Sequence, residues 1–101
     1  MTLFEQKVFK LVKKIPKGKV STYQILAQKL GNKKSSQAVG NALSKNLLLI
    51  KIPCHRIVKS TGYIGNYALG LAKKRRLLQN EGILINKDKI ASLTDYLYTF
   101  N

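Results

Sequence analysis

The sequence contains one cysteine, one histidine, two prolines and no tryptophan. A single cysteine rules out an internal disulfide, and one cysteine with one histidine is too few ligands for a structural zinc site. The N-terminus lacks the pattern of a signal peptide, and no apolar run approaches the length of a membrane-spanning helix. We therefore expect a soluble, cytoplasmic protein, folded as a single domain over residues 1–101, with no metal and no cofactor.

Acidic residues are scarce as well, with four of them against 19 lysines and arginines and a net charge of +15. Because the acids are Glu5, Glu81, Asp88 and Asp95, residues 6–80 contain none, while 17 of the 19 basic residues lie there. Solvated surfaces normally mix both signs of charge, so a block of one sign indicates a polyanionic partner. Nucleic acid is the leading candidate. An anionic membrane surface is weaker, since no segment has the Trp- and Phe-rich face of a membrane-surface helix.

Apolar spacing predicts four helices, at residues 2–15, 21–30, 36–45 and 68–80. The first two begin with the capping boxes Thr2-x-x-Glu5 and Ser21-x-x-Gln24, and Pro16, Gly31 and Gly82 mark helix ends. The core-facing residues of the first three helices are expected to be Phe4, Val8, Leu11, Ile15, Ile25, Leu26, Leu30, Val39, Ala42 and Leu43. Two short helices joined by a glycine-containing turn suggest a helix-turn-helix whose third helix meets DNA.

The remaining segments are short. Residues 47–52 are predicted to be buried extended chain that leads into the middle of the protein. A small hairpin is expected from residues 57–58 and 63–64 around the turn signal Ser-Thr-Gly, and a second ribbon from residues 83–85 and 89–91. The aromatic tail, residues 92–101, receives no assignment. The fold class is therefore mainly α, a winged-helix-like DNA-binding domain with a helix-turn-helix and short β-hairpins.

Cys54 and His55 stand next to each other in the segment Ile52–Ile57. A thiol beside an imidazole can perform nucleophilic chemistry, because the base helps to form the thiolate. The more common meaning of such a pair is a buried, inert cysteine beside a structural histidine. The dipeptide alone leaves both readings open.

The wider pattern resembles the O6-alkylguanine-DNA alkyltransferase family. Residues 53–57, Pro-Cys-His-Arg-Ile, resemble the Pro-Cys-His-Arg-Val signature of its active site. Residues 15–23 are similar to the segment that enters the family's helix-turn-helix, and residues 38–42 to its recognition helix. Asn46 stands where the family has the asparagine that ends this helix, and residues 77–82 match the closing helix. The resemblance covers residues 3 to about 90 in the family's order and spacing.

The resemblance implies direct reversal of DNA damage by a single-turnover enzyme. The family flips an alkylated guanine out of the duplex and moves the alkyl group to its own cysteine, here Cys54. His55 would draw off the thiol proton through a water, Glu81 would orient His55, and Asn46 would tie the recognition helix to the active-site turn. Tyr23 would donate its hydroxyl to guanine N3 or to a phosphate. Arg56 is expected to give structural support.

The same resemblance implies two further groups of residues and a partner. The DNA-binding residues would be Tyr23, Gln37, Ala38, Gly40, Asn41, Ser44, Lys33 and Lys34. The substrate pocket would be lined by Tyr23, Pro53, Ile57, Tyr67, Ala68 and Leu69. The partner would be double-stranded DNA containing an alkylated guanine, bound through the minor groove by a monomer with the damaged base flipped.

Three features depart from the family pattern. Gln37 occupies the position of the arginine that fills the gap left by the flipped base, and glutamine lacks the charge and stacking plane of guanidinium. Leu69 replaces a glycine of the substrate loop, which would narrow or reshape the pocket. Many members also carry an N-terminal domain, so this chain is expected to be a bare catalytic domain.

Two other functions fit parts of the pattern. A non-enzymatic helix-turn-helix protein, either an alkyl-lesion sensor or a regulator, would bind DNA and leave Cys54 unmodified. The related alkyltransferase-like proteins bind damage without repair and usually have tryptophan at the cysteine position, so Cys54 argues against that role. A Cys-His hydrolase is poorly supported, because such enzymes bring their histidine from far along the chain.

Overall fold

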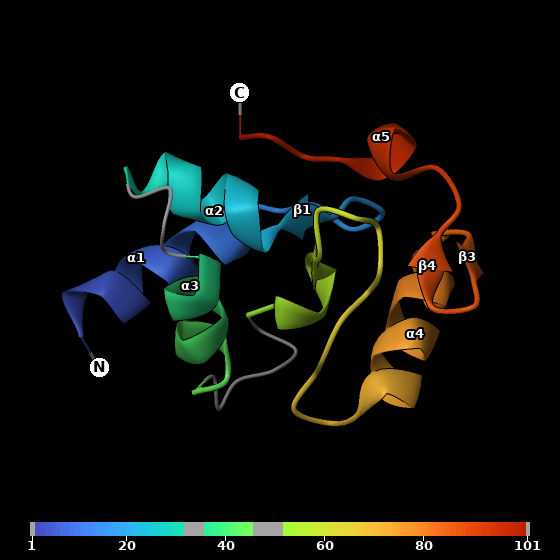
Figure 1. Cartoon of the computed structure of the whole chain (residues 1–101), viewed down its shortest axis with the longest axis horizontal. Coiled ribbons are helices and arrows are strands. Elements are labelled where there is room, and N and C mark those ends of the chain that lie inside the picture. Colours follow the sequence, from blue (N-terminus) through green and yellow to red (C-terminus); the bar gives the residue numbers. More distant parts are fainter. Residues whose placement is uncertain (1, 32–35, 46–51, 101) are drawn as a thin grey trace.

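The computed structural model describes residues 2–31, 36–45 and 52–100. Its elements, in chain order (Figure 1), are α1 (Leu3–Val12), β1 (Ser21–Thr22), α2 (Tyr23–Lys29), α3 (Ser36–Leu43), the 3-10 helix η1 (Cys54–Arg56), β2 (Ile57–Val58), α4 (Leu71–Asn80), β3 (Ile85–Asn86), β4 (Lys89–Ile90) and α5 (Leu93–Tyr96). The prediction of a mainly helical domain with short strands is confirmed. Among the described residues, no helix is long and apolar enough to cross a membrane.

Helix α1 begins where its capping box predicts. The Thr2 hydroxyl accepts a hydrogen bond from the Glu5 amide, and the Glu5 carboxylate accepts one from the Thr2 amide. The helix ends at Val12, three residues earlier than expected, and a turn before Pro16 carries Ile15 into the core. The buried stripe of α1 also differs from the prediction, since it comprises Val8, Phe9 and Val12.

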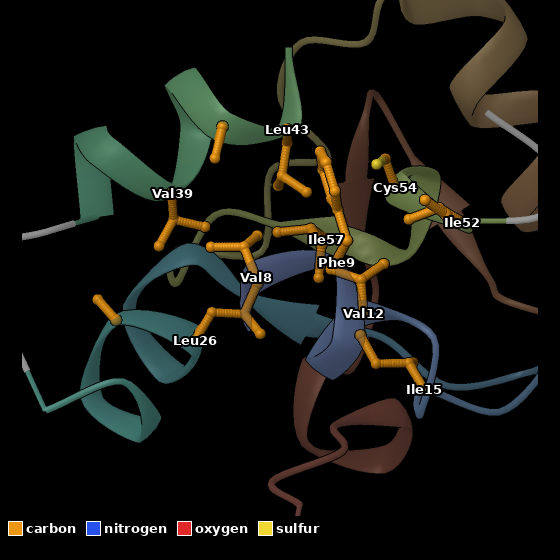
Figure 2. Close-up of a cluster of buried hydrophobic side chains, with 12 residues drawn as sticks. Val8, Phe9, Val12, Ile15, Leu26, Val39, Leu43, Ile52, Cys54 and Ile57 are labelled. Atoms are coloured by element: carbon orange, nitrogen blue, oxygen red, sulfur yellow. The ribbon is translucent and has the colours of Figure 1, made fainter. Parts of the chain in front are cut away.

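Helices α1, α2 and α3 pack together around the main hydrophobic core (Figures 1 and 2). The three residues predicted for α3, namely Val39, Ala42 and Leu43, are all buried. In α2 the buried residues are Leu26 and Ala27, whereas Ile25 and Leu30 are only half-buried. Figure 2 shows Cys54 at the edge of this cluster, so the main core supports the segment that carries the thiol.

The start of α2 corrects the second capping box. Ser21 and Thr22 form β1 instead of a first helical turn, and the Thr22 hydroxyl caps the helix by accepting a hydrogen bond from the Ile25 amide. The physical reason is a contact with a distant part of the chain. Residues 21 and 22 pair in parallel with Ile57 and Val58 of β2, which holds both of them in an extended conformation.

The expected hairpin around residues 60–62 is also corrected. The turn itself is present, since the Lys59 amide donates to the Tyr63 carbonyl at 2.9 Å. However, β2 pairs with β1, and Tyr63 forms an isolated antiparallel bridge with Lys89 instead. The second ribbon is confirmed as β3 and β4, which join through Lys87 and Asp88, both with positive φ.

Helix α4 and the β3–β4 ribbon enclose a second, smaller core with Val20, Val58, Ile64, Leu78, Ile83 and Ile90. The helix starts at Leu71 and not at Ala68, because Gly70 is its N-cap with a φ of +95°, outside the helical region. Residues 66–70 therefore form the end of the loop that leads into α4 (Figure 1).

The tail is ordered along residues 92–100 and runs back across the molecule from α5 towards α2 (Figure 1). The Val20 amide donates to the Tyr96 carbonyl, and the Val20 carbonyl accepts a hydrogen bond from the Tyr98 amide. Val20, the residue before β1, therefore forms an isolated parallel bridge with Leu97. Tyr98 and Phe100 then pack edge to face against each other, with ring centroids 4.8 Å apart, and both contact the main core. The backbone hydrogen bonds of the tail thus hold in place the segment that leads through β1 to Tyr23.

Candidate active site

The segment 53–58 is built from a tight turn followed by a strand. Pro53 is the N-cap of η1, and the Arg56 amide donates to its carbonyl at 3.0 Å. Cys54 is only 7% exposed, and its amide donates to the Ile52 carbonyl at 2.7 Å. Since β2 follows η1 directly and pairs with β1, the turn bearing Cys54 is held beside the start of α2, where Tyr23 lies.

Next to the cysteine in the chain, the buried His55 forms a network with the partly buried Arg56 and Glu81. His55 Nε2 lies 2.8 Å from Glu81 Oε2. The Arg56 guanidinium donates to the same carboxylate through Nε at 3.0 Å and Nη2 at 2.9 Å, and its Nη1 donates to the Ile15 carbonyl at 2.8 Å. Glu81 therefore joins the end of α4 to η1, and Arg56 has the structural role that the sequence pattern indicates.

The network controls the charges of its members. Burial raises the pKa of Glu81, but the hydrogen bonds from Arg56 and His55 outweigh this and lower it below its ordinary value, so the carboxylate is ionised. For His55, burial lowers the pKa and outweighs the opposing effect of Glu81. His55 is therefore neutral near pH 7. If its Nε2 carries the proton that faces Glu81, Nδ1 is the basic nitrogen, and Nδ1 has no hydrogen-bond partner among the described residues.

Cys54 lines a cavity of about 650 Å³ between α3, the start of α2 and the 66–68 loop. The other lining residues are Tyr23, Ser36, Gln37, Gly40, Asn41, Leu43, Ser44, Lys59, Asn66, Tyr67 and Ala68. Cavities of this size accommodate small organic ligands. Cys54 thus lines a hollow that is large enough for a nucleobase.

One face of α3 forms a wall of this cavity. Gln37, Gly40 and Asn41 of α3, with Ser44 directly after its end, follow the helical spacing of three or four residues, opposite the buried face of the helix. At Gly40 an added Cβ would lie 3.9 Å from Cε1 of Tyr23, so the helix backbone approaches the tyrosine ring closely. Burial, with a contribution from Cys54, raises the pKa of Tyr23 and keeps its hydroxyl protonated.

The structure brings together most, but not all, of the residues singled out in the sequence. Among the described residues, Ala38, Pro53, Ile57 and Leu69 do not line the cavity. Ala38 and Leu69 are exposed, Pro53 is buried in the turn, and Ile57 is fully buried in the main core. Three other predicted residues, Asn46, Lys33 and Lys34, lie outside the described residues.

Lys74 is a residue of the site's surroundings that the sequence pattern had not distinguished from its basic neighbours. Its side chain is 1% exposed, and Nζ donates to the carbonyls of Ile57 at 2.6 Å and Asn66 at 3.1 Å. Burial lowers the pKa of Lys74 to about 7. The feature of the sequence that indicates its burial is its position four residues before Leu78, which places both side chains on the inner face of α4. Lys74 thus ties β2 to the loop that lines the cavity.

The comparisons with known proteins fit this geometry. The family model described as 6-O-methylguanine DNA methyltransferase, DNA binding domain, matches residues 3–83. The chain belongs to this family. The resemblance noted in the sequence is therefore confirmed for most of the chain.

Two curated relatives share the name methylated-DNA--protein-cysteine methyltransferase. The protein of Saccharolobus solfataricus is 52% identical over 82 residues, which are 81% of this chain and 52% of the relative. The protein of Candida glabrata is 37% identical over 105 residues, covering 97% of this chain and 51% of the relative. The chain thus spans about half the length of the curated relatives it matches.

Two solved structures of the family resemble the fold of this chain, one over nearly all of it and one over 80% of it. S. pombe Atl1, in complex with damaged DNA containing O6-carboxymethylguanine, matches with a TM-score of 0.86 and 29% identity, over 97% of this chain and 98% of that one. Mycobacterium tuberculosis OGT in complex with DNA matches with a TM-score of 0.78 and 36% identity, over 80% of this chain and 50% of that one. Homologous structures of this domain are therefore complexes with DNA.

Proposed function

We propose that the chain transfers an alkyl group from O6 of a damaged guanine in DNA to the sulfur of Cys54. The observation that carries the proposal is the position of Cys54, which lines a nucleobase-sized cavity, while His55, the next residue in the chain, is paired with Glu81. The names of the curated relatives support the same reaction. The chemistry is a single displacement. A sulfur–carbon bond forms, the carbon–O6 bond breaks, and guanine takes up a proton in place of the one that the thiol loses.

Each member of the network has a defined part in this proposal. His55, neutral because its pKa is lowered by burial, accepts the thiol proton at Nδ1 through a water. The ionised Glu81 fixes the imidazole orientation through Nε2 and stabilises the positive charge that forms on the ring. Arg56 holds Glu81 in place and is not itself near the reacting atoms in this scheme. Asn46 retains the role that the resemblance implies, as a link between the third helix and the active-site turn.

The partner in this proposal is double-stranded DNA with the damaged base flipped into the cavity. Flipping is required because a stacked guanine does not expose O6 to in-line attack. The small and polar face of α3, with Gly40 at its centre, favours close approach to the minor groove, and the net charge of +15 favours binding to phosphates. We propose that one monomer acts on one lesion, in the cytoplasm, where an acceptor thiol stays reduced.

A second candidate function is lesion sensing without transfer. The match to S. pombe Atl1 favours it, because that protein aligns with this chain over nearly the full length of both and was solved on DNA containing O6-carboxymethylguanine. Cys54 favours transfer, since a sensor needs no buried nucleophile beside a base. The two functions differ in a single observable, which is the chemical state of Cys54 after binding.

A stoichiometry experiment tests the proposal. A duplex with one O6-methylguanine is mixed in excess with the protein, and repaired guanine is quantified by nucleoside chromatography. We expect one repaired guanine per protein molecule and then no further reaction, because the chain holds no second thiol that could remove the alkyl group. Cys54→Ser should bind the same duplex and yield no repaired guanine. Continued turnover, or repair by Cys54→Ser, would contradict the mechanism.

A further inference from the structure

Lys59 is a cavity residue for which the reaction proposed above has no use. It follows β2 directly, and the turn that it begins is closed by two hydrogen bonds, from the Lys59 amide to the Tyr63 carbonyl and from the Gly62 amide to the Lys59 carbonyl, both 2.9 Å. Its side chain lines the cavity that holds Cys54 and also an adjoining hollow of about 530 Å³. Its backbone is therefore held by the turn, while its exposed side chain is shared by the two spaces.

The path of the Lys59 side chain is set by Gly65. A Cβ at Gly65 would lie 3.6 Å from both Cγ and Cε of Lys59, and 3.7 Å from the hydroxyl oxygen of Tyr23. The aliphatic stem of the lysine thus lies along the bare glycine backbone, and the Tyr23 hydroxyl lies close to the same glycine. Because Gly65 has a φ of +77°, a side chain there is disfavoured, which keeps this path open.

The charge of Lys59 is not neutralised within the described part of the chain. The acids Glu5, Glu81 and Asp88 pair with other cations, Asp95 forms no ion pair with Lys59, and neither an aspartate nor a glutamate is among the described residues that line the cavity. The ammonium also contributes to the lowered pKa of Lys74, after the larger effect of burial, as expected if the two cations are close. The cavity mouth therefore carries an unneutralised positive charge.

From this geometry we propose that Lys59 makes the cavity accept alkyl groups that carry a carboxylate, with O6-carboxymethylguanine as the model substrate. The inference rests on the proposed transfer to Cys54. When a thiolate attacks the methylene carbon of a carboxymethyl group, the sulfur–carbon bond forms beside a carboxylate of like charge. The carbon–O6 bond breaks, the electron pair goes to the guanine, and guanine gains a proton as the thiol loses one. An ammonium group at the cavity mouth offsets the repulsion between thiolate and carboxylate.

The experiment compares two lesions in the same duplex sequence, O6-carboxymethylguanine and O6-methylguanine, under single-turnover conditions. In Lys59→Gln, the ratio of the carboxymethyl rate to the methyl rate should fall about two- to fivefold, the effect of a partly exposed ion pair. Lys73→Gln is the matched control, since Lys73 is exposed on α4 and does not line the cavity, and its ratio should equal that of the wild-type protein. Because Lys59 is exposed, its substitution should leave the melting temperature unchanged.

The outcomes separate this inference from other roles of Lys59. If both lesions slow by the same factor in Lys59→Gln, the lysine contacts a DNA phosphate and the inference is overturned. An unchanged ratio overturns it as well. If the wild-type protein transfers neither group, the proposed transfer to Cys54 is refuted. The affinities for the two duplexes then test the carboxylate contact of Lys59 separately. A loss of preference for the carboxymethyl duplex in Lys59→Gln supports the carboxylate contact, and equal preference in both proteins refutes it.

Discussion

The buried Lys74 gives a quantitative prediction for stability. Burial lowers its pKa from 10.5 to about 7 in the folded chain, whereas in the unfolded chain the pKa returns to the higher value. Between these two values the unfolded chain binds more protons than the folded one, so the free energy of unfolding rises with pH. At about 1.4 kcal/mol per proton and pH unit, Lys74 adds about 2 kcal/mol to the free energy of unfolding between about pH 7 and pH 9.

Substitution by methionine removes this proton and keeps a side chain of similar length. We expect urea denaturation of the wild-type protein to give a free energy of unfolding that rises by about 2 kcal/mol more than that of Lys74→Met over the same pH interval. Lys73→Met, at the exposed neighbouring position, should follow the wild-type protein. Parallel pH profiles for the wild-type protein and Lys74→Met would refute the reasoning, because they would mean that Lys74 keeps an ordinary pKa in the folded chain.

Four further predictions concern DNA and the reaction. Gln37→Arg should speed transfer from duplex DNA about ten- to thirtyfold, because arginine eases base flipping, and should barely change the reaction with free O6-benzylguanine, which needs no flipping. Both rates are measured by quenched flow. Equal acceleration of both would place residue 37 in the chemical step. Glu81→Gln should slow transfer about a hundredfold with little change in DNA affinity, because His55 loses the negative charge that stabilises its protonated form. An unchanged transfer rate would show that Glu81 has no part in the mechanism. In the wild-type protein the transfer rate should fall with acid only below the ordinary histidine value of 6.5, since burial lowers the pKa of His55 and only the neutral ring accepts a proton. DNA affinity should fall about a hundredfold between about 50 and 200 mM salt if about four phosphates are contacted. An affinity that does not depend on salt would show that residues 6–80, which contain no acidic residue, do not form the DNA-binding surface.

Local signals in the sequence predicted the parts of the fold that local interactions determine. The capping box of Thr2 and Glu5, the buried face of α3 and the ribbon around Asn86, Lys87 and Asp88 each depend on residues within a few positions of one another. The residues of the Cys54 segment were found because the motif is contiguous. Its link to Glu81 came from the family resemblance, since 26 positions separate that carboxylate from His55.

Long-range contacts determine what the sequence did not predict. Strands β1 and β2 have two residues each, too few for an alternating pattern, and only their mutual pairing explains why Ser21 leaves the helix. Lys74 lies in a run of four basic residues and is distinguished only by its buried contacts with two carbonyls. Lys59 enters the cavity because Gly65 leaves room for its stem, a contact that spacing does not reveal.

The central claim is that Cys54 is an alkyl acceptor and not a structural residue of a lesion sensor. Intact-mass spectrometry after incubation with a duplex containing O6-methylguanine, followed by peptide mapping, tests it most directly. Transfer predicts that the protein gains one methyl group, located on Cys54, and that Cys54→Ser gains none. A protein that binds the damaged duplex with its mass unchanged would contradict the claim and establish lesion sensing as the function.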